Sequence, residues 1–153
     1  MAMTVTDEAA ATLHDLLSRR FDEHSRRLHQ LSKSEVDHFT AMINAAFFEA
    51  ARSRFIKDGK PASDAKVIDY VAYARSWDEG SAEEIDPDAG ERLINVVIEK
   101  LPLDALDDLD NNVVFNSKLM LLASFVREAN YTEEELLAKL IQQARNTAEE
   151  MLS

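Results

Sequence analysis

The chain has 153 residues, which suits one domain with a core of its own. The absence of cysteine excludes disulfides and cysteine zinc sites, and three glycines and three prolines leave little room for sheets joined by tight turns. The formal net charge of −12 is concentrated in residues 78–110, which hold twelve acidic and two basic residues, whereas residues 1–60 hold nine of each. Such a field repels phosphate and anionic lipid, so we expect the chain to bind no nucleic acid and no membrane.

The N-terminal third predicts a long antiparallel helical hairpin. Apolar side chains recur at spacings of three and four along residues 6–31, after a good N-cap at Thr6, and again along residues 35–57. The connection between the two helices is short, which predicts that they lie antiparallel. Gly59 marks the end of the second helix.

Further helices are predicted along the rest of the chain. Residues 78–84 are interpreted as a loop or a fraying helix end, and residues 103–112 as a turn or a short helix. The remaining helical segments are residues 63–77, 86–101, 113–126 and 132–151, of which Leu119–Val126 is apolar on most sides and is expected at the buried centre. The sequence therefore predicts an all-α fold, a single-domain bundle of five or six helices over residues 1–153, built on the N-terminal hairpin.

Two patterns resemble metal-binding motifs but lack features that such sites require. Glu35-x-x-His38 has the ligand spacing of di-iron bundles, yet it occurs once, and the helical periodicity places His38 opposite the apolar stripe, toward water. Residues 108–119 begin like a calcium loop, but Val113 stands at the glycine position and Leu119 at the bidentate glutamate position. We expect no metal, no cofactor and no catalytic residue.

His24 is the polar side chain in the middle of the first apolar stripe. One interpretation is a core histidine that a neighbouring helix or a second subunit satisfies by a hydrogen bond. The other is a residue of a small-molecule pocket inside the bundle. No serine nucleophile motif, phosphate loop or dinucleotide glycine pattern accompanies it.

Charged residues suggest two kinds of protein contact. Arg20 and Arg27 flank the first apolar stripe and are expected to pair with carboxylates of another helix or subunit. The length of the hairpin stripes, which need more cover than the shorter helices provide, predicts a homodimer through the first two helices.

The acidic segment 78–110 is either a solvated surface or the docking surface for a basic protein partner, with Asp104, Asp107, Asp108 and Asp110 as its candidate residues. The N-terminus has no basic region followed by an apolar signal core, so we expect a cytoplasmic protein. The sequence favours a small acidic interaction or regulatory protein without catalytic activity. The alternative is a helical small-molecule-binding protein or enzyme with a pocket near His24.

Overall fold

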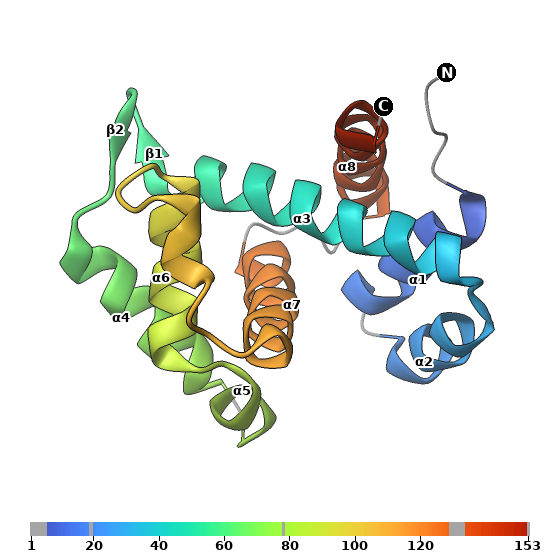
Figure 1. Ribbon diagram of the computed structural model, residues 1–153, viewed down its shortest axis with the longest axis horizontal. Coiled ribbons are helices and arrows are strands. Elements are labelled where there is room, and N and C mark those ends of the chain that lie inside the picture. The colour runs from blue at the N-terminus through green and yellow to red at the C-terminus, as the bar shows by residue number, and fades with distance from the viewer. Residues whose placement is uncertain (1–5, 19, 78, 129–133, 153) are drawn as a thin grey trace. The chain divides into compact units, whose positions relative to one another are not determined.

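The computed structural model describes residues 6–18, 20–77, 79–128 and 134–152 (Figure 1). The all-α prediction is confirmed, because helices dominate this part of the chain and its strands form one two-stranded sheet. The elements are α1 (Asp7–Leu17), α2 (Phe21–Gln30), α3 (Lys33–Phe55), β1 (Ile56–Lys57), β2 (Lys60–Pro61), α4 (Asp64–Arg75), α5 (Glu79–Glu84), α6 (Pro87–Val97), the 3-10 helix η1 (Leu103–Leu106), α7 (Asn111–Glu128) and α8 (Glu134–Leu152).

The chain forms two compact units. Unit 1 consists of Met1–Ala46 and Val126–Ser153, and unit 2 consists of Phe47–Phe125. The long helices α3 and α7 contribute residues to both units. The expectation of a single domain stays a prediction.

The helix predicted over residues 6–31 is divided in two. Helix α1 ends at Leu17, and α2 packs against it. The buried Asp15 accepts a hydrogen bond from Nε of Arg27 at 2.7 Å and pairs with Arg20 at 3.0 Å. A continuous helix would separate Asp15 from Arg27 by about 18 Å along its axis, so this pairing requires the chain to reverse between them.

Unit 1 buries the central residues of the apolar stripes that the sequence predicted. Leu13 and Leu17 of α1 and Phe39 and Ile43 of α3 are all buried. Helix α8 packs against α1, and Arg145 Nη2 lies 2.9 Å from Asp7 Oδ1 across that contact. Leu28 and Leu31 of the first stripe are half-buried, and Val36 of the second is 37% exposed, so part of each stripe is not covered within one chain.

Unit 2 is built around a cluster of aromatic rings. Phe47, Phe55, Tyr70 and Phe125 are buried, and their ring centroids lie 5.2–5.9 Å apart in the contacting pairs. The Tyr70 hydroxyl is satisfied by the Ser124 hydroxyl at 2.8 Å. Aromatic pairs at such spacings stabilise a core beyond their buried area.

Close packing of α6 explains its glycine. A Cβ atom on Gly90 would lie 3.2 Å from Cγ1 of Val71, on α4, so a side chain there would require Val71 to shift by a few tenths of an ångström. These two helices pack directly against each other in unit 2.

The turn after α3 is a small β-hairpin. Asp58 and Gly59 have φ of 53° and 75°, the left-handed conformation that a type I′ turn needs at both central residues. Ile56 pairs with Pro61 on either side of it. The helix predicted over residues 35–57 ends at Phe55, because Ile56 and Lys57 form β1. The hairpin was not predicted, although an Asp-Gly pair is typical of such a turn.

The structure shows what two segments form for which the sequence left alternatives open, and the start of the last helix lies outside the described residues. Residues 79–84 form helix α5, and residues 103–106 form η1. The predicted start of the last helix at Thr132 lies outside the described residues. In the segment expected at the buried centre, Leu121 and Leu122 are fully buried, but Leu119 is partly exposed.

Candidate functional site

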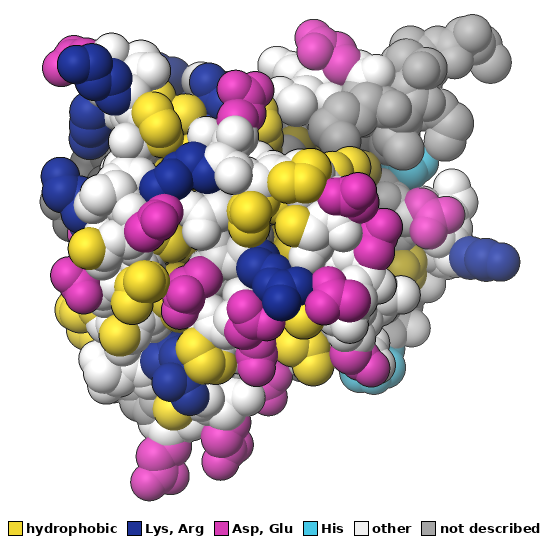
Figure 2. All heavy atoms as spheres, turned by 60° about the vertical axis from the view of Figure 1, so that its left-hand side comes forward, with side chains coloured by type: hydrophobic (Ala, Val, Ile, Leu, Met, Phe, Trp, Pro, Cys, Tyr) yellow, Lys and Arg dark blue, Asp and Glu magenta, His cyan; other side chains and the backbone are white. Residues whose placement is uncertain are grey.

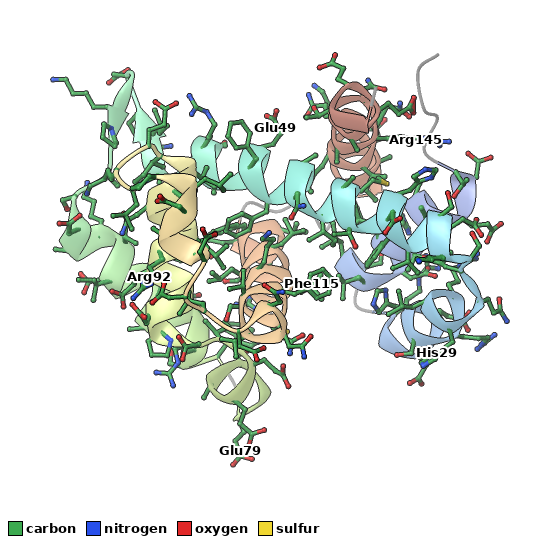
Figure 3. The ribbon with its side chains drawn as sticks, in the orientation of Figure 1. His29, Glu49, Glu79, Arg92, Phe115 and Arg145 are labelled. Atoms are coloured by element: carbon green, nitrogen blue, oxygen red, sulfur yellow. The ribbon has the colours of Figure 1, made fainter. Side chains whose placement is uncertain are left out.

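The acidic segment lies in α5, α6, η1 and the connections between them, all within unit 2. Figure 2 shows a face on which acidic side chains are interspersed with hydrophobic and basic ones, and Figure 3 shows Glu79 projecting away from α5. Some of the segment's carboxylates are exposed and make no ion pair within the described residues. We call these the acidic surface: Glu79, Glu83, Glu84, Glu99, Asp104 and Asp107.

Arg92 neutralises two other carboxylates of the segment. Its guanidinium lies 2.8 Å from Asp108 Oδ1 and 3.1 Å from Asp88 Oδ2, and it donates to the carbonyl of Ala105 at 3.0 Å (Figure 3). Desolvation opposes the charge of Arg92, but the hydrogen bonds and charges of Asp108 and Asp88 outweigh it and raise its pKa. Arg92 therefore fastens η1 and the loop after it to α6.

Two aspartates of the segment are helix caps. The carboxylate of Asp110 accepts the backbone N–H of Asn112 at 2.8 Å, at the start of α7. The carboxylate of Asp86 accepts the N–H of Ala89 at 2.8 Å, at the start of α6. All four aspartates proposed from the sequence are exposed, but Asp108 pairs with Arg92 and Asp110 caps a helix, whereas Asp104 and Asp107 make no ion pair within the described residues.

An apolar side chain stands among these carboxylates. Leu103, at the start of η1, is 75% exposed and precedes Asp104 directly. A single exposed leucine is common on protein surfaces, so Leu103 by itself does not mark an interface.

A cavity of about 360 Å³ lies in unit 2. It is lined by Asp64, Ile68, Glu91, Asn95, Lys100 and Leu101. Burial raises the pKa of Glu91, and the nearby charge of Asp88 raises it further. The side-chain oxygen of Asn95 is buried and has no hydrogen-bond partner among the described residues.

Arg20 and Arg27 lie in unit 1, and both pair with a carboxylate of the neighbouring helix α1. Asp15 holds both guanidinium groups, and Arg27 also lies 3.3 Å from Glu8. Both arginines remain 40–55% exposed. Water therefore screens these pairs, although Asp15 itself is buried.

His24 has the surroundings of a core histidine. It is buried, its Nδ1 donates to the carbonyl of Thr12 at 2.9 Å, and its ring lies 5.7 Å from that of Phe39. It does not line the cavity of unit 2. A neighbouring helix thus satisfies it, as the first interpretation of the sequence expected.

The predicted exposure of His38 is wrong. Its side chain is buried, and neither ring nitrogen has a hydrogen-bond partner among the described residues. Helix α3 is covered on more than one side, so the face opposite its first stripe is buried too. The carboxylate of Glu35 accepts the backbone N–H of Ser32 and the hydroxyl of Thr6, and the hydrogen bond from the Ser32 N–H is the main cause of its lowered pKa.

The sequence missed the cavity residues. Glu91 and Asn95 are four residues apart on α6 and so face the same way, which periodicity alone reveals. Their meeting with Asp64 and Ile68 depends on how α4 packs against α6, and no local pattern encodes it.

Comparisons of the chain with protein-family models, curated proteins and solved structures find no match. Among the described residues, no group of three or more histidine or carboxylate side chains is placed to hold a metal ion. No described helix is long and apolar enough to cross a membrane. The functional argument therefore rests on charge and on the cavity.

Proposed function

We propose that this protein is a small, non-enzymatic cytoplasmic interaction protein that binds a basic protein partner through the acidic surface of unit 2. The observation that carries the proposal is that the cations of the acidic segment are already engaged. Arg92 pairs with Asp88 and Asp108, and Lys100 pairs with Asp64, outside the segment. The acidic surface therefore keeps its negative charge, which attracts a basic partner and steers its approach.

Exposed apolar groups support the same proposal. Leu103 lies beside Asp104 in η1, and Tyr73 and Trp77, close to the start of α5, are each 47% exposed. Aromatic side chains are enriched at protein interfaces, where they supply most of the contact energy. A partner held by these groups would be oriented by the surrounding carboxylates.

Association kinetics test the proposal. A basic protein that co-purifies with the chain is used as the partner. Its association rate is measured with the parent protein and with the double variant Asp104→Asn, Asp107→Asn. We expect slower association of the double variant at low salt and equal rates at about 1 M salt, where the Debye length falls to about 3 Å from about 8 Å at physiological ionic strength.

A matched variant controls for total charge. Asp37→Asn with Glu49→Gln removes the same charge from exposed positions outside the acidic segment, and neither residue makes an ion pair within the described residues. This control should associate at nearly the parent rate. Equal slowing in both double variants would mean that net charge, and not the acidic surface, guides the partner.

The sequence also left open a small-molecule function. A metabolite that binds only the folded state at a hundred times its dissociation constant adds about 2.7 kcal/mol of stability, so a thermal-shift screen would detect it. A hit would favour that alternative over the interaction protein. Homodimerisation is a separate proposal, and a monomer mass by light scattering at tens of micromolar would end it.

A further inference from the structure

Helix α4 of unit 2 presents an apolar face to solvent. Ile68 is 48% exposed, and Tyr73 and Trp77, the latter two residues beyond the helix, are each 47% exposed. The residues along the middle of this exposed side have short side chains, which let a second helix approach closely. They are Ala65, Asp69, Ala72 and Ser76. Large apolar side chains around a row of short ones thus form a helix face that no other described element covers.

The end of unit 2 where α4 begins carries positive charge. Lys57, Lys60 and Lys66 are exposed and make no ion pair within the described residues. Asp58, in the turn between the first two, offsets one of their charges. Asp64, the other carboxylate there, already has a lysine partner.

The end of unit 2 where α4 finishes carries negative charge. The exposed glutamates of α5 are Glu79, Glu83 and Glu84. Arg75 offsets one of these charges and donates to carbonyl groups of Ala82 and Ile85. Figure 1 shows the β-hairpin and α5 at opposite ends of unit 2, and α4 connects the two along the chain.

Two copies can pair these opposite charges when their α4 helices lie antiparallel. A two-fold axis midway along the helix, near residues 70–71, sets the start of each α4 against the end of the other, so the favourable contact occurs twice. The 12 residues of α4 span about 18 Å. Like ends of the two copies are therefore separated by more than the Debye length of about 8 Å at physiological ionic strength, and their repulsion is largely screened.

We propose that this protein forms a symmetric homodimer in which the exposed faces of two antiparallel α4 helices pack together. The contact removes Ile68, Tyr73 and Trp77 from water, and the paired charges at its two ends fix the antiparallel orientation. It uses no residue of unit 1, so it differs from the dimer that the sequence predicted through the first two helices.

This dimer goes beyond the proposed function and does not require it. Asp104 and Asp107 lie in and directly after η1, outside the α4 pairing, so they stay available to a basic partner. Tyr73 and Trp77 lie inside the pairing, so a partner that uses these rings competes with the second copy.

Light scattering after size exclusion measures the mass at tens of micromolar and physiological salt. We expect a dimer for the parent and a monomer for Ala72→Glu, because two added carboxylates meet at the centre of the contact. Ala72 is exposed and glutamate is a good helix former, so helical circular dichroism should not change. Gln143→Glu adds the same charge at an exposed position of α8 and should dimerise as the parent does. A monomeric parent, or equal weakening by the two variants, would overturn the proposal.

Exchange of charges tests the antiparallel arrangement. Lys66→Glu alone and Glu79→Lys alone each place like charges at both ends of the contact, so each should weaken the dimer at least fivefold. An equal mixture of the two variants allows a mixed dimer with opposite charges at both ends, and its affinity should return close to that of the parent. A mixture that dimerises no better than either variant alone contradicts the antiparallel pairing.

Trp77 reports on the contact because it is the single tryptophan of the chain. Its quenching by acrylamide should fall as the parent dimerises with rising concentration, and should stay constant in Ala72→Glu. A dimer that forms without any change in this quenching pairs through other elements, which rules out the α4 contact. The double variant Asp104→Asn, Asp107→Asn should dimerise like the parent, so slower association of a basic partner with that variant tests the proposed function separately.

Discussion

Replacing His38 by leucine should stabilise the protein. The imidazole is 6% exposed, and both of its ring nitrogens lack a hydrogen-bond partner among the described residues. Each unsatisfied buried polar group costs about 1–3 kcal/mol, whereas a leucine of similar size has no polar atom to satisfy. An imperfect fit of the leucine in the space of the imidazole can reduce this gain in the free energy of unfolding by up to about 1.5 kcal/mol. We expect His38→Leu to raise the free energy of unfolding by about 1–3 kcal/mol.

The second buried histidine of unit 1 supplies the control. His24 donates to the carbonyl of Thr12 at 2.9 Å and packs against the ring of Phe39. His24→Leu deletes that hydrogen bond, which contributes about 0.5–1.5 kcal/mol, so it should destabilise. The same substitution is therefore expected to raise the free energy of unfolding at one buried site and to lower it at the other. This difference distinguishes the effect of hydrogen bonding from a general preference for apolar side chains.

Urea unfolding followed by far-ultraviolet circular dichroism measures both variants. Fluorescence is less suitable, because the single tryptophan, Trp77, lies in unit 2 and reports on that unit. A gain of 1–3 kcal/mol raises the melting temperature of a chain of this length by about 2–12 °C. If His38→Leu lowers stability by 1 kcal/mol or more, the imidazole makes an interaction that the geometry does not contain, and the reasoning fails.

Three further substitutions test other parts of unit 2. Glu99 has φ of 65°, where a side chain is strained, so Glu99→Gly should stabilise by about 1 kcal/mol in urea unfolding. Asp110 caps α7, so Asp110→Ala should lower stability by about 1 kcal/mol, whereas Asp110→Asn should be nearly neutral by calorimetry. Burial and the charge of Asp88 raise the pKa of Glu91, so the ionised carboxylate destabilises the fold. Glu91→Gln should therefore raise the free energy of unfolding at pH 7, and this gain should vanish as the pH falls below 4.5, the ordinary pKa of a glutamate.

Helix starts were predictable because caps act over three residues. The hydroxyl of Thr6 accepts the N–H of Ala9 at 3.2 Å, and the hydroxyl of Ser63 accepts that of Lys66 at 3.3 Å. Asp86 caps α6 in the same manner. Each interaction joins residues close in sequence, so the residue types alone reveal it.

The break between α1 and α2 was not predictable from periodicity. The apolar spacing of residues 6–31 continues through the break, so the periodicity predicts one continuous helix. The reversal is stabilised by Asp15 and Arg27, twelve positions apart, and such a pair can be identified only once the chain is known to turn back.

The burial of α3 was missed for a related reason. The periodicity of the sequence predicted a single apolar stripe along this helix. In the structure, residues on several of its sides are buried, His38 among them. The signal was its alanine content, because small side chains let neighbouring helices approach from more than one direction. The buried alanines of this helix are Ala41, Ala45, Ala46, Ala50 and Ala51.

For the candidate site, composition located the acidic segment but could not rank its carboxylates. Asp108 is bound by Arg92, sixteen positions away, and Asp110 caps a helix that begins earlier than the apolar pattern indicated. Only Asp104 and Asp107 of the predicted four remain exposed without such a role. Charge density is a property of composition, whereas the availability of a charge depends on the tertiary structure.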